Sequence, residues 1–153
     1  MNEERMKKIL WILVAIGACL VAAAAFSAEP PGEKAGEEGA RRAAGEAAKS
    51  WLGVVDVGRY AESWGRASAL FRKQVSAEQW ETAARSARGP LGKLVARNLK
   101  GAQYSRTLPG APDGEYVVIQ YDSSFENKKE ALETVVTMKE KDEAWRVGGY
   151  FIR

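Results

Sequence analysis

The sequence EYVVIQYDSSF, residues 115–125, decides the fold class of this protein. Its side chains alternate along the segment, and one face carries the large apolar residues Val117, Ile119, Tyr121 and Phe125. An alternation of period two is typical of a strand that covers a core with one of its faces. We therefore predict a β-strand here, and the neighbouring segments show which strands join it.

Similar segments flank this strand on both sides. Short turns rich in Pro, Gly and Asp separate them, and short turns join antiparallel neighbours. We therefore predict a four-stranded antiparallel meander. The predicted strands are residues 94–108, with a bulge at Lys100-Gly101, then 115–125, 130–140 and 144–153.

The half of the domain before these strands has the period of helices. One apolar stripe runs from Ala44 to Val55 and ends at Gly58, and a second runs from Tyr60 to Val75. A third helix is predicted from Ser76, where Gln79 completes a capping box. Helices followed by strands indicate the α+β class, with the N-terminal helices packed on the sheet.

The start of the chain has the pattern of an export signal. Met1–Lys8 is charged, and the apolar segment Ile9–Phe26 follows it. Three fates fit this pattern: cleavage between Ser27 and Ala28, lipidation of Cys19, or retention as a membrane anchor. We favour cleavage, because small residues stand at the two positions before that bond that a signal peptidase reads.

These observations divide the chain into three parts. Residues 1–27 are the predicted signal peptide or membrane anchor. Residues 28–43 are a predicted disordered linker, because they are rich in glycine and charge and contain no bulky apolar residue. Residues 44–153 form one predicted α+β domain. We expect the protein to be exported, to the periplasm or the cell envelope.

Composition excludes several kinds of chemistry. The chain has no histidine, and its one cysteine lies in the predicted signal. The mature chain therefore has no imidazole or thiol for catalysis and no zinc site of the usual kind, and we expect no cofactor and no metal.

The net charge of the chain is +3. Residues 1–27 hold three basic and two acidic residues, so the mature protein has a net charge of +2. This charge is too small to indicate nucleic-acid binding, and we expect membrane contact only through the N-terminal segment.

Five segments of the domain are similar to those of a known family: Trp51–Phe71, Arg88–Gly92, Leu108–Tyr116, Glu133–Val135 and the ending Trp145–Arg153. Through them the domain resembles an uncharacterised group of exported bacterial proteins, domain of unknown function number 4019, over nearly all of residues 44–153. This family is similar in layout to the nuclear-transport-factor-like and cystatin-like cone fold, in which helices close over a curved sheet.

The resemblance implies a pocket between the helices and the sheet, and some cone-fold proteins are enzymes. Their Asp–His chemistry is excluded here, since histidine is absent. A carboxylate version would need Asp56, Asp122 or Glu133 buried together, with Arg97 beside them, because burial raises a carboxylate pKa towards that of a general base. The spacing favours simpler roles: Asp56 as a solvated or capping residue, Asp122 facing water, and Glu133 in a cross-strand ion pair on the solvated side.

Aromatic and basic residues have structural interpretations too. Most aromatics are predicted to form the core. Tyr116 and Tyr150 fall opposite the apolar faces of their strands, so we expect them to be exposed and available to a partner. Arg88, Arg97 and Arg146 are expected to be solvated or in surface ion pairs.

Two functions remain. The first is a non-catalytic binding module of the cell envelope, which binds a small ligand or an envelope protein and forms a homodimer if its sheet is the interface. For a small ligand, the candidate residues are Tyr121, Glu133 and Tyr150. The alternative is a cofactor-independent acid–base enzyme, an isomerase, dehydratase or hydrolase that uses buried carboxylates.

Overall fold

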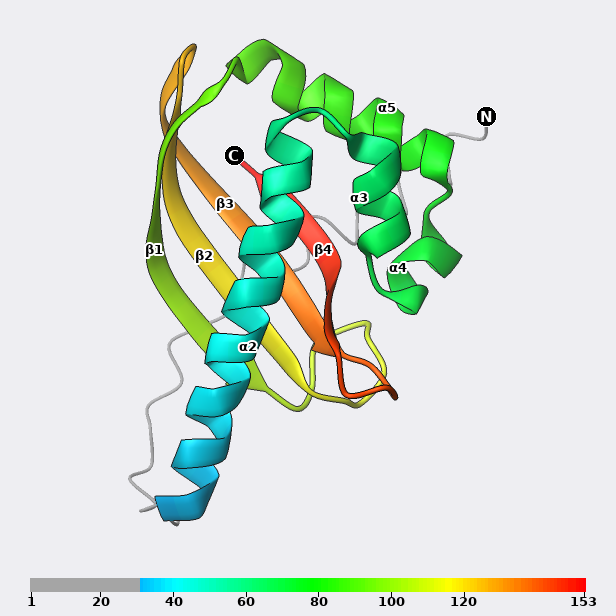
Figure 1. The fold of residues 1–153 in the computed structure, drawn as a ribbon, viewed down its shortest axis with the longest axis vertical. Helices are drawn as coiled ribbons and strands as arrows, with labels where there is room; N and C mark the ends of the chain where they lie inside the picture. The colour runs from blue at the N-terminus through cyan, green and yellow to red at the C-terminus, as the bar shows by residue number, and fades with distance from the viewer. Residues whose placement is uncertain (1–30) are drawn as a thin grey trace.

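The computed structural model describes residues 31–153, and it has the predicted α+β layout. The predicted signal, with Cys19, Ser27 and Ala28, lies outside the described residues. Four α-helices and a short 3-10 helix precede the strands (Figure 1). The elements are α2 (Pro31–Asp56), α3 (Tyr60–Arg66), α4 (Ala69–Gln74), α5 (Ala77–Arg88), η1 (Gly89–Leu91), β1 (Leu94–Ser105), β2 (Tyr116–Phe125), β3 (Lys128–Lys139) and β4 (Trp145–Ile152).

The strands form one antiparallel sheet in the order β1-β2-β3-β4, which confirms the predicted meander. The predicted bulge is confirmed as well, because the register of β1 against β2 shifts between Leu99 and Gly101. A second shift, between Leu94 and Ala96, lies nearer the start of β1. Both irregularities fall in the strand at one edge of the sheet, where bulges are common.

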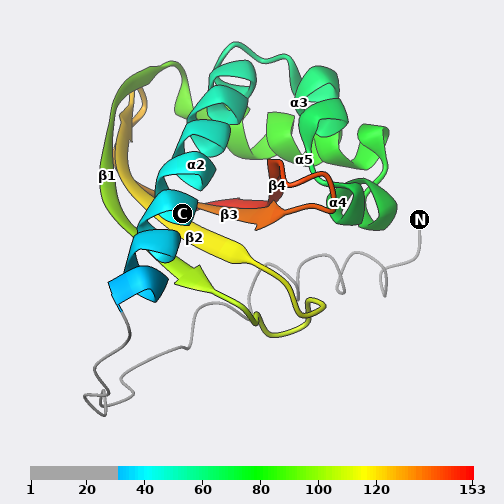
Figure 2. The same ribbon diagram turned by 60° about the horizontal axis from the view of Figure 1, so that its bottom comes forward.

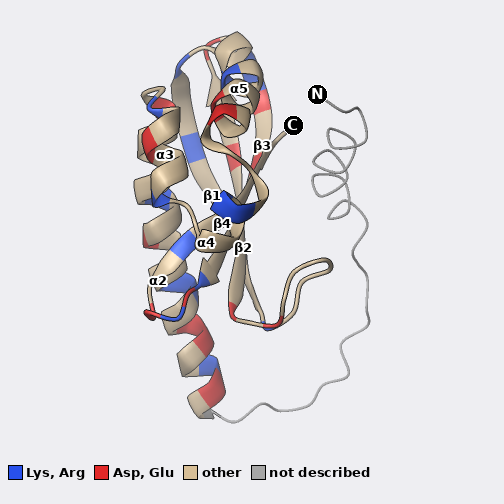
Figure 3. Cartoon of the chain, turned by 90° about the vertical axis from the view of Figure 1, so that its right-hand side faces the viewer, with Lys and Arg blue, Asp and Glu red and all other residues tan. Residues whose placement is uncertain are grey.

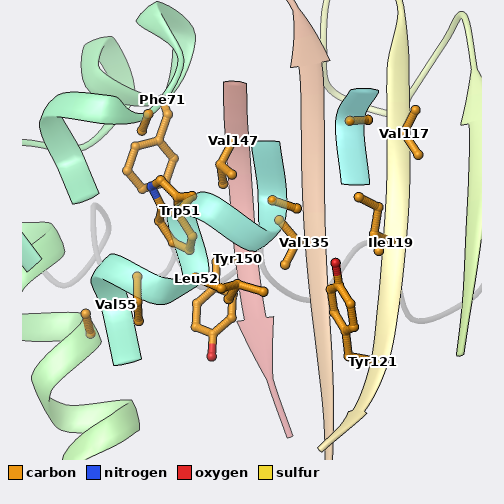
Figure 4. Packing of buried hydrophobic residues seen from close by; sticks show 14 of the residues in the cluster. Trp51, Leu52, Val55, Phe71, Val117, Ile119, Tyr121, Val135, Val147 and Tyr150 are labelled. Atoms are coloured by element: carbon orange, nitrogen blue, oxygen red, sulfur yellow. The ribbon is translucent and has the colours of Figure 1, made fainter. Parts of the chain in front are cut away.

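The helices cover one face of the sheet, which we call the inner face. Helix α2 crosses it diagonally, and the sheet curves around this helix (Figures 1 and 2). The core lies between the two layers, with apolar side chains of α2 directed at those of β2, β3 and β4 (Figure 4). Leu52, Ile119 and Val135 are fully buried there. No helix within residues 31–153 is long and apolar enough to cross a membrane.

Helix α2 is much longer than the sequence predicted. It begins at Pro31, so the prediction of a disordered linker is wrong for residues 31–43, and residues 28–30 lie outside the described part. The helix is anchored by Ala44 and Ala48, which are fully buried. Towards its start, alanines favour the helix and Arg41 pairs with Glu37 one turn earlier at 3.1 Å. Charges of both signs mark this part of α2 in Figure 3.

The second predicted helix, residues 60–75, is two helices in the structure. The chain turns sharply at Ser68, whose hydroxyl accepts a hydrogen bond from the Phe71 amide and so begins α4. Apolar spacing alone did not reveal this break, because Trp64 and Phe71 stay on the core side of both pieces. The third helix begins at the predicted capping box of Ser76 and Gln79, which is confirmed.

Both tyrosines predicted to be exposed are buried. The register between β3 and β4 shifts at Gly148, so Val147 and Tyr150 both lie on the inner face although they are three residues apart. Tyr116 lies on the outer face, but the turn before β2 covers it, and its hydroxyl donates to the Pro112 carbonyl at 2.5 Å. The simple alternation of buried and exposed side chains therefore fails at Tyr150 because of a bulge, and at Tyr116 because of a covering turn.

Candidate functional site

Four charged side chains meet where the helices come closest to the end of the sheet. Asp56 is the last residue of α2, and Arg88 is the last residue of α5. Arg97 lies on β1 and Glu133 on β3, both on the inner face. We call these four residues the ionic cluster. They come from four elements and are distant in sequence, so only the tertiary fold brings them together.

Glu133 is at the centre of the ionic cluster and is fully buried. One carboxylate oxygen, Oε1, accepts hydrogen bonds from Arg88 at 2.9 Å, from Arg97 at 3.0 Å and from the Tyr150 hydroxyl at 2.6 Å. The other, Oε2, accepts from the Nε of Arg97 and from the Ser123 hydroxyl, both at 2.6 Å. Both oxygens are thus occupied by protein donors, as a buried carboxylate requires.

Asp56 completes the ionic cluster from the helical side. It accepts from Arg88 at 2.6 Å and from the two terminal nitrogens of Arg97 at 2.7 and 2.9 Å. Two guanidinium groups therefore face two carboxylates, and the formal charges cancel. The side chains of Asp56 and Arg97 keep 19% and 13% of their surface exposed, so the cluster reaches the surface on the side of β1.

The network sets the protonation states of Glu133 and Tyr150. Burial alone would raise the pKa of Glu133, but hydrogen bonds from Arg97, Ser123 and Tyr150 outweigh it, and the pKa is lowered. Burial raises the pKa of Tyr150, and the Glu133 charge raises it further. Glu133 is therefore an ionised acceptor at neutral pH, and Tyr150 is a neutral donor.

The structure brings together some of the predicted residues and separates others. Glu133 and Tyr150 are in contact, and Tyr121 lies opposite Glu133 on the neighbouring strand. Asp122 points away from them and pairs with Lys100 at 2.9 Å, with 59% of its side chain exposed, as expected for a residue facing water.

Three predictions about these residues were wrong. Glu133 is in an ion pair, but on the buried side, because the inner face of β3 is the one that carries Glu133, Val135 and Thr137. Asp56 is not mainly solvated: 19% of its side chain is exposed, and its carboxylate pairs with Arg88 and Arg97. Arg88 is buried and not on the surface: its guanidinium carbon lies 4.6 Å from the centroid of the Phe125 ring. The local sequence pattern does not indicate that Arg88 is buried, because the helix residues before it have an ordinary mixture of polar and apolar side chains.

Three exposed apolar residues are close in sequence to members of the ionic cluster. Among residues 31–153, the exposed large hydrophobic residues are Val57, Val95 and Leu99, each between 64% and 66% exposed. Val57 follows Asp56 directly, and the other two stand two residues before and after Arg97. Leu99 shares the inner face with Arg97, since the register between them is unbroken. Together they form an apolar rim, which we define as Val57, Val95 and Leu99.

The two edges of the sheet differ in how they are covered. At β4, the Val147 carbonyl accepts a hydrogen bond of 2.8 Å from the buried Ser68, so the turn between α3 and α4 lies along that edge. At β1, Figure 1 shows no helix or strand of residues 31–153 beyond the strand. None of the 12 residues of β1 is fully buried. An open edge with exposed apolar side chains is a template for pairing with another strand.

A separate hollow lies on the outer face of the sheet. Its volume is about 690 Å³, and it is wide open to solvent. Its lining mixes polar and apolar surface and includes Asn98, Asp122 and Leu132. It does not include a residue of the ionic cluster.

Within the described residues, no three His, Cys, Asp or Glu side chains are grouped so that they could hold a metal ion.

Residues 47–150 match the family model described as Protein of unknown function (DUF4019). The chain belongs to this family. The match confirms the resemblance to domain of unknown function number 4019, and the DUF4019 region contains all four residues of the ionic cluster. No curated protein and no solved structure matches the chain.

The first prediction concerns Arg88. Replacing it with Met leaves Glu133 and Asp56 with one guanidinium fewer in a buried setting, so we expect the free energy of unfolding to fall by about 3–5 kcal/mol. Urea unfolding of Arg88→Met at pH 7 measures this. The matched control is Arg85→Met on the same helix, where the side chain is 70% exposed and only a 3.8 Å ion pair is lost. The control is expected within about 0.5 kcal/mol of wild type, and equal losses in the two variants would show that the ionic cluster is dispensable.

The second prediction concerns pH. The pKa of Glu133 is lower in the folded state than the ordinary value of about 4.3. At pH values between these two pKa values, the unfolded chain therefore binds more protons than the folded chain. The contribution of Glu133 to stability is therefore present above about pH 4.3 and is lost as pH falls through the folded pKa.

Urea unfolding between pH 7 and pH 3 tests this effect. The stability difference between wild type and Glu133→Gln should shrink as pH falls, whereas Glu130→Gln, an exposed change on the same strand, should stay close to wild type throughout. A difference for Glu133→Gln that is constant with pH contradicts the assignment.

Proposed function

We propose that the protein is a non-catalytic protein-binding module of the bacterial cell envelope that docks its partner along the edge of β1. The observation that carries this proposal is the contrast between the two edges of the sheet. At the β4 edge, Ser68 donates a hydrogen bond to the Val147 carbonyl, whereas no strand or helix of the described residues pairs with the β1 edge, which bears the exposed Val95 and Leu99. Strand addition at an open edge is a common mode of recognition: main-chain hydrogen bonds give affinity, and side-chain contacts give specificity.

The ionic cluster supports this proposal as a brace for the docking edge. Arg97 ties β1 to α2 and β3. Its guanidinium donates four hydrogen bonds, two to Asp56 and two to Glu133. A strand fixed in this way presents its free backbone groups in one conformation. Less ordering entropy is then lost when a partner binds.

A protein partner fits the geometry better than a small ligand held by Tyr121, Glu133 and Tyr150. Glu133 has no exposed surface, and its two oxygens are occupied by donors of the chain. A ligand at these residues would have to displace the network, which would leave buried charges unpaired. The exposed rim of Val57, Val95 and Leu99 needs no such rearrangement.

The acid–base alternative is less well supported. Asp56 and Glu133 do come together with Arg97, as a carboxylate mechanism would need. However, a general base at neutral pH needs a raised pKa, and that of Glu133 is lowered.

The proposed location in the cell envelope rests on the export pattern of residues 1–27, with cleavage between Ser27 and Ala28 as the favoured processing step.

Photo-crosslinking of the full-length chain in a bacterial envelope tests the proposed function. A photoreactive phenylalanine derivative at Leu99 should cross-link to a protein, because this side chain lies on the docking edge. The same residue at Thr82, which is exposed on α5 away from the sheet edge, is the control and should give no product. The proposal is wrong if both positions give the same products, or if Leu99 gives none.

A further inference from the structure

We propose that the β1 edge takes an extended acidic segment of another protein. This inference rests on the proposed function, because it names the chemistry of the partner at the same edge. The charge of the edge strand carries it. Between Lys93 and Pro112 the chain has four basic residues, Lys93, Arg97, Lys100 and Arg106, and no Asp or Glu. The chain as a whole has 23 basic and 20 acidic residues, so this stretch is unusually one-sided.

The basic residues of the edge differ in how far the chain itself meets their charge. Arg97 is already paired with both carboxylates of the ionic cluster. Lys100 and Arg106, in contrast, have 51% and 73% of their side-chain surface exposed. Their ion pairs, with Asp122 at 2.9 Å and with Glu33 at 4.0 Å, join exposed side chains and are weak. Both cations can therefore turn to a carboxylate of a partner.

Lys100 and Arg106 stand at the two ends of a regular run of β1. The register of β1 against β2 is unbroken from Gly101 to Ser105, after the second of its two shifts. A side-chain carbon added at Gly101 would meet no atom within 4 Å, so the surface there is open. Strand addition favours such a run, because a bulge interrupts the ladder of backbone hydrogen bonds.

These positions define the partner segment. Six residues separate Lys100 from Arg106, a distance of about 20 Å along a strand. The segment therefore needs about seven extended residues with a carboxylate near each end. Opposite charges placed in this way fix the register and exclude wrong partners. An apolar residue of the segment would contact Leu99, which is 64% exposed beside Lys100. A second β1 strand fits poorly, because it would bring the same basic charges to the edge.

Peptide binding to the full chain in detergent tests this chemistry. The probes are two fluorescein-labelled peptides of about nine residues, long enough to pass both basic residues. One alternates Glu with Val, and the other alternates Lys with Val. We expect the wild-type chain to bind the Glu peptide at least about tenfold more tightly. This preference should shrink when NaCl is raised from about 0.05 M to about 0.5 M, because salt screens exposed charges.

Variants at the edge show which residues give the preference. Lys100→Glu/Arg106→Glu should invert it, and tighter binding of the Lys peptide would also show that this variant is folded. Lys100→Gln/Arg106→Gln, a milder change, should bind the two peptides alike. The matched control Lys73→Glu/Arg85→Glu changes the net charge as much as the first variant. Its exposed residues lie on α4 and α5, away from the β1 edge (Figure 1), so the preference for the Glu peptide should remain.

Equal affinity of the wild-type chain for the two peptides, or binding of neither, would overturn the inference. So would an unchanged preference in both edge variants. Photo-cross-linking at Leu99 separates this failure from failure of the proposed function. A product with another protein, but no preference for the Glu peptide, would remove the acidic partner and leave the docking edge in place. A cross-linked dimer of the chain would make a second copy the occupant instead. No product at Leu99 would remove both proposals.

Discussion

Burial of the Glu133 carboxylate is the constraint on which the arrangement of this domain depends. An ionised carboxylate without solvent is tolerated only if it is paired and hydrogen-bonded on both oxygens. Here the donors come from α5, β1, β2 and β4, through Arg88, Arg97, Ser123 and Tyr150. One side chain on β3 therefore fixes where the end of α5 and the edge strand lie. Asp56 adds the end of α2 to the same network.

The two edges of the sheet have different neighbours. At the β4 edge, Ser68 between α3 and α4 donates a hydrogen bond to the Val147 carbonyl. At the β1 edge, Asp56 at the end of α2 pairs with Arg97 and with Arg88 at the end of α5. The pairs on Arg97 hold β1 from its inner face and leave its far edge free. Such an edge invites aggregation unless it has a partner. An edge held rigid and left open is consistent with a docking strand.

The sequence predicted the α+β class, the strand order, the bulge at Lys100-Gly101 and the capping box at Ser76, because these depend on local periodicity and turn chemistry. It failed for Glu133, because both faces of β3 carry apolar residues and alternation cannot say which one is buried. It failed for Tyr150 because the bulge at Gly148 exchanges the faces of β4. The ionic cluster joins residues that are 32 to 45 positions apart, which no local pattern reports.

The most direct test of this account is a double-mutant cycle on Arg97 and Glu133. Arg97→Met, Glu133→Gln and the double variant are compared with wild type by urea unfolding at pH 7. Residues of one buried network are coupled, so the double variant should cost clearly less than the sum of the two single changes, by about 1–3 kcal/mol. Costs that add to within about 0.5 kcal/mol would mean that the two side chains act independently, and Glu133 would not be the centre that holds the sheet edge to the helices.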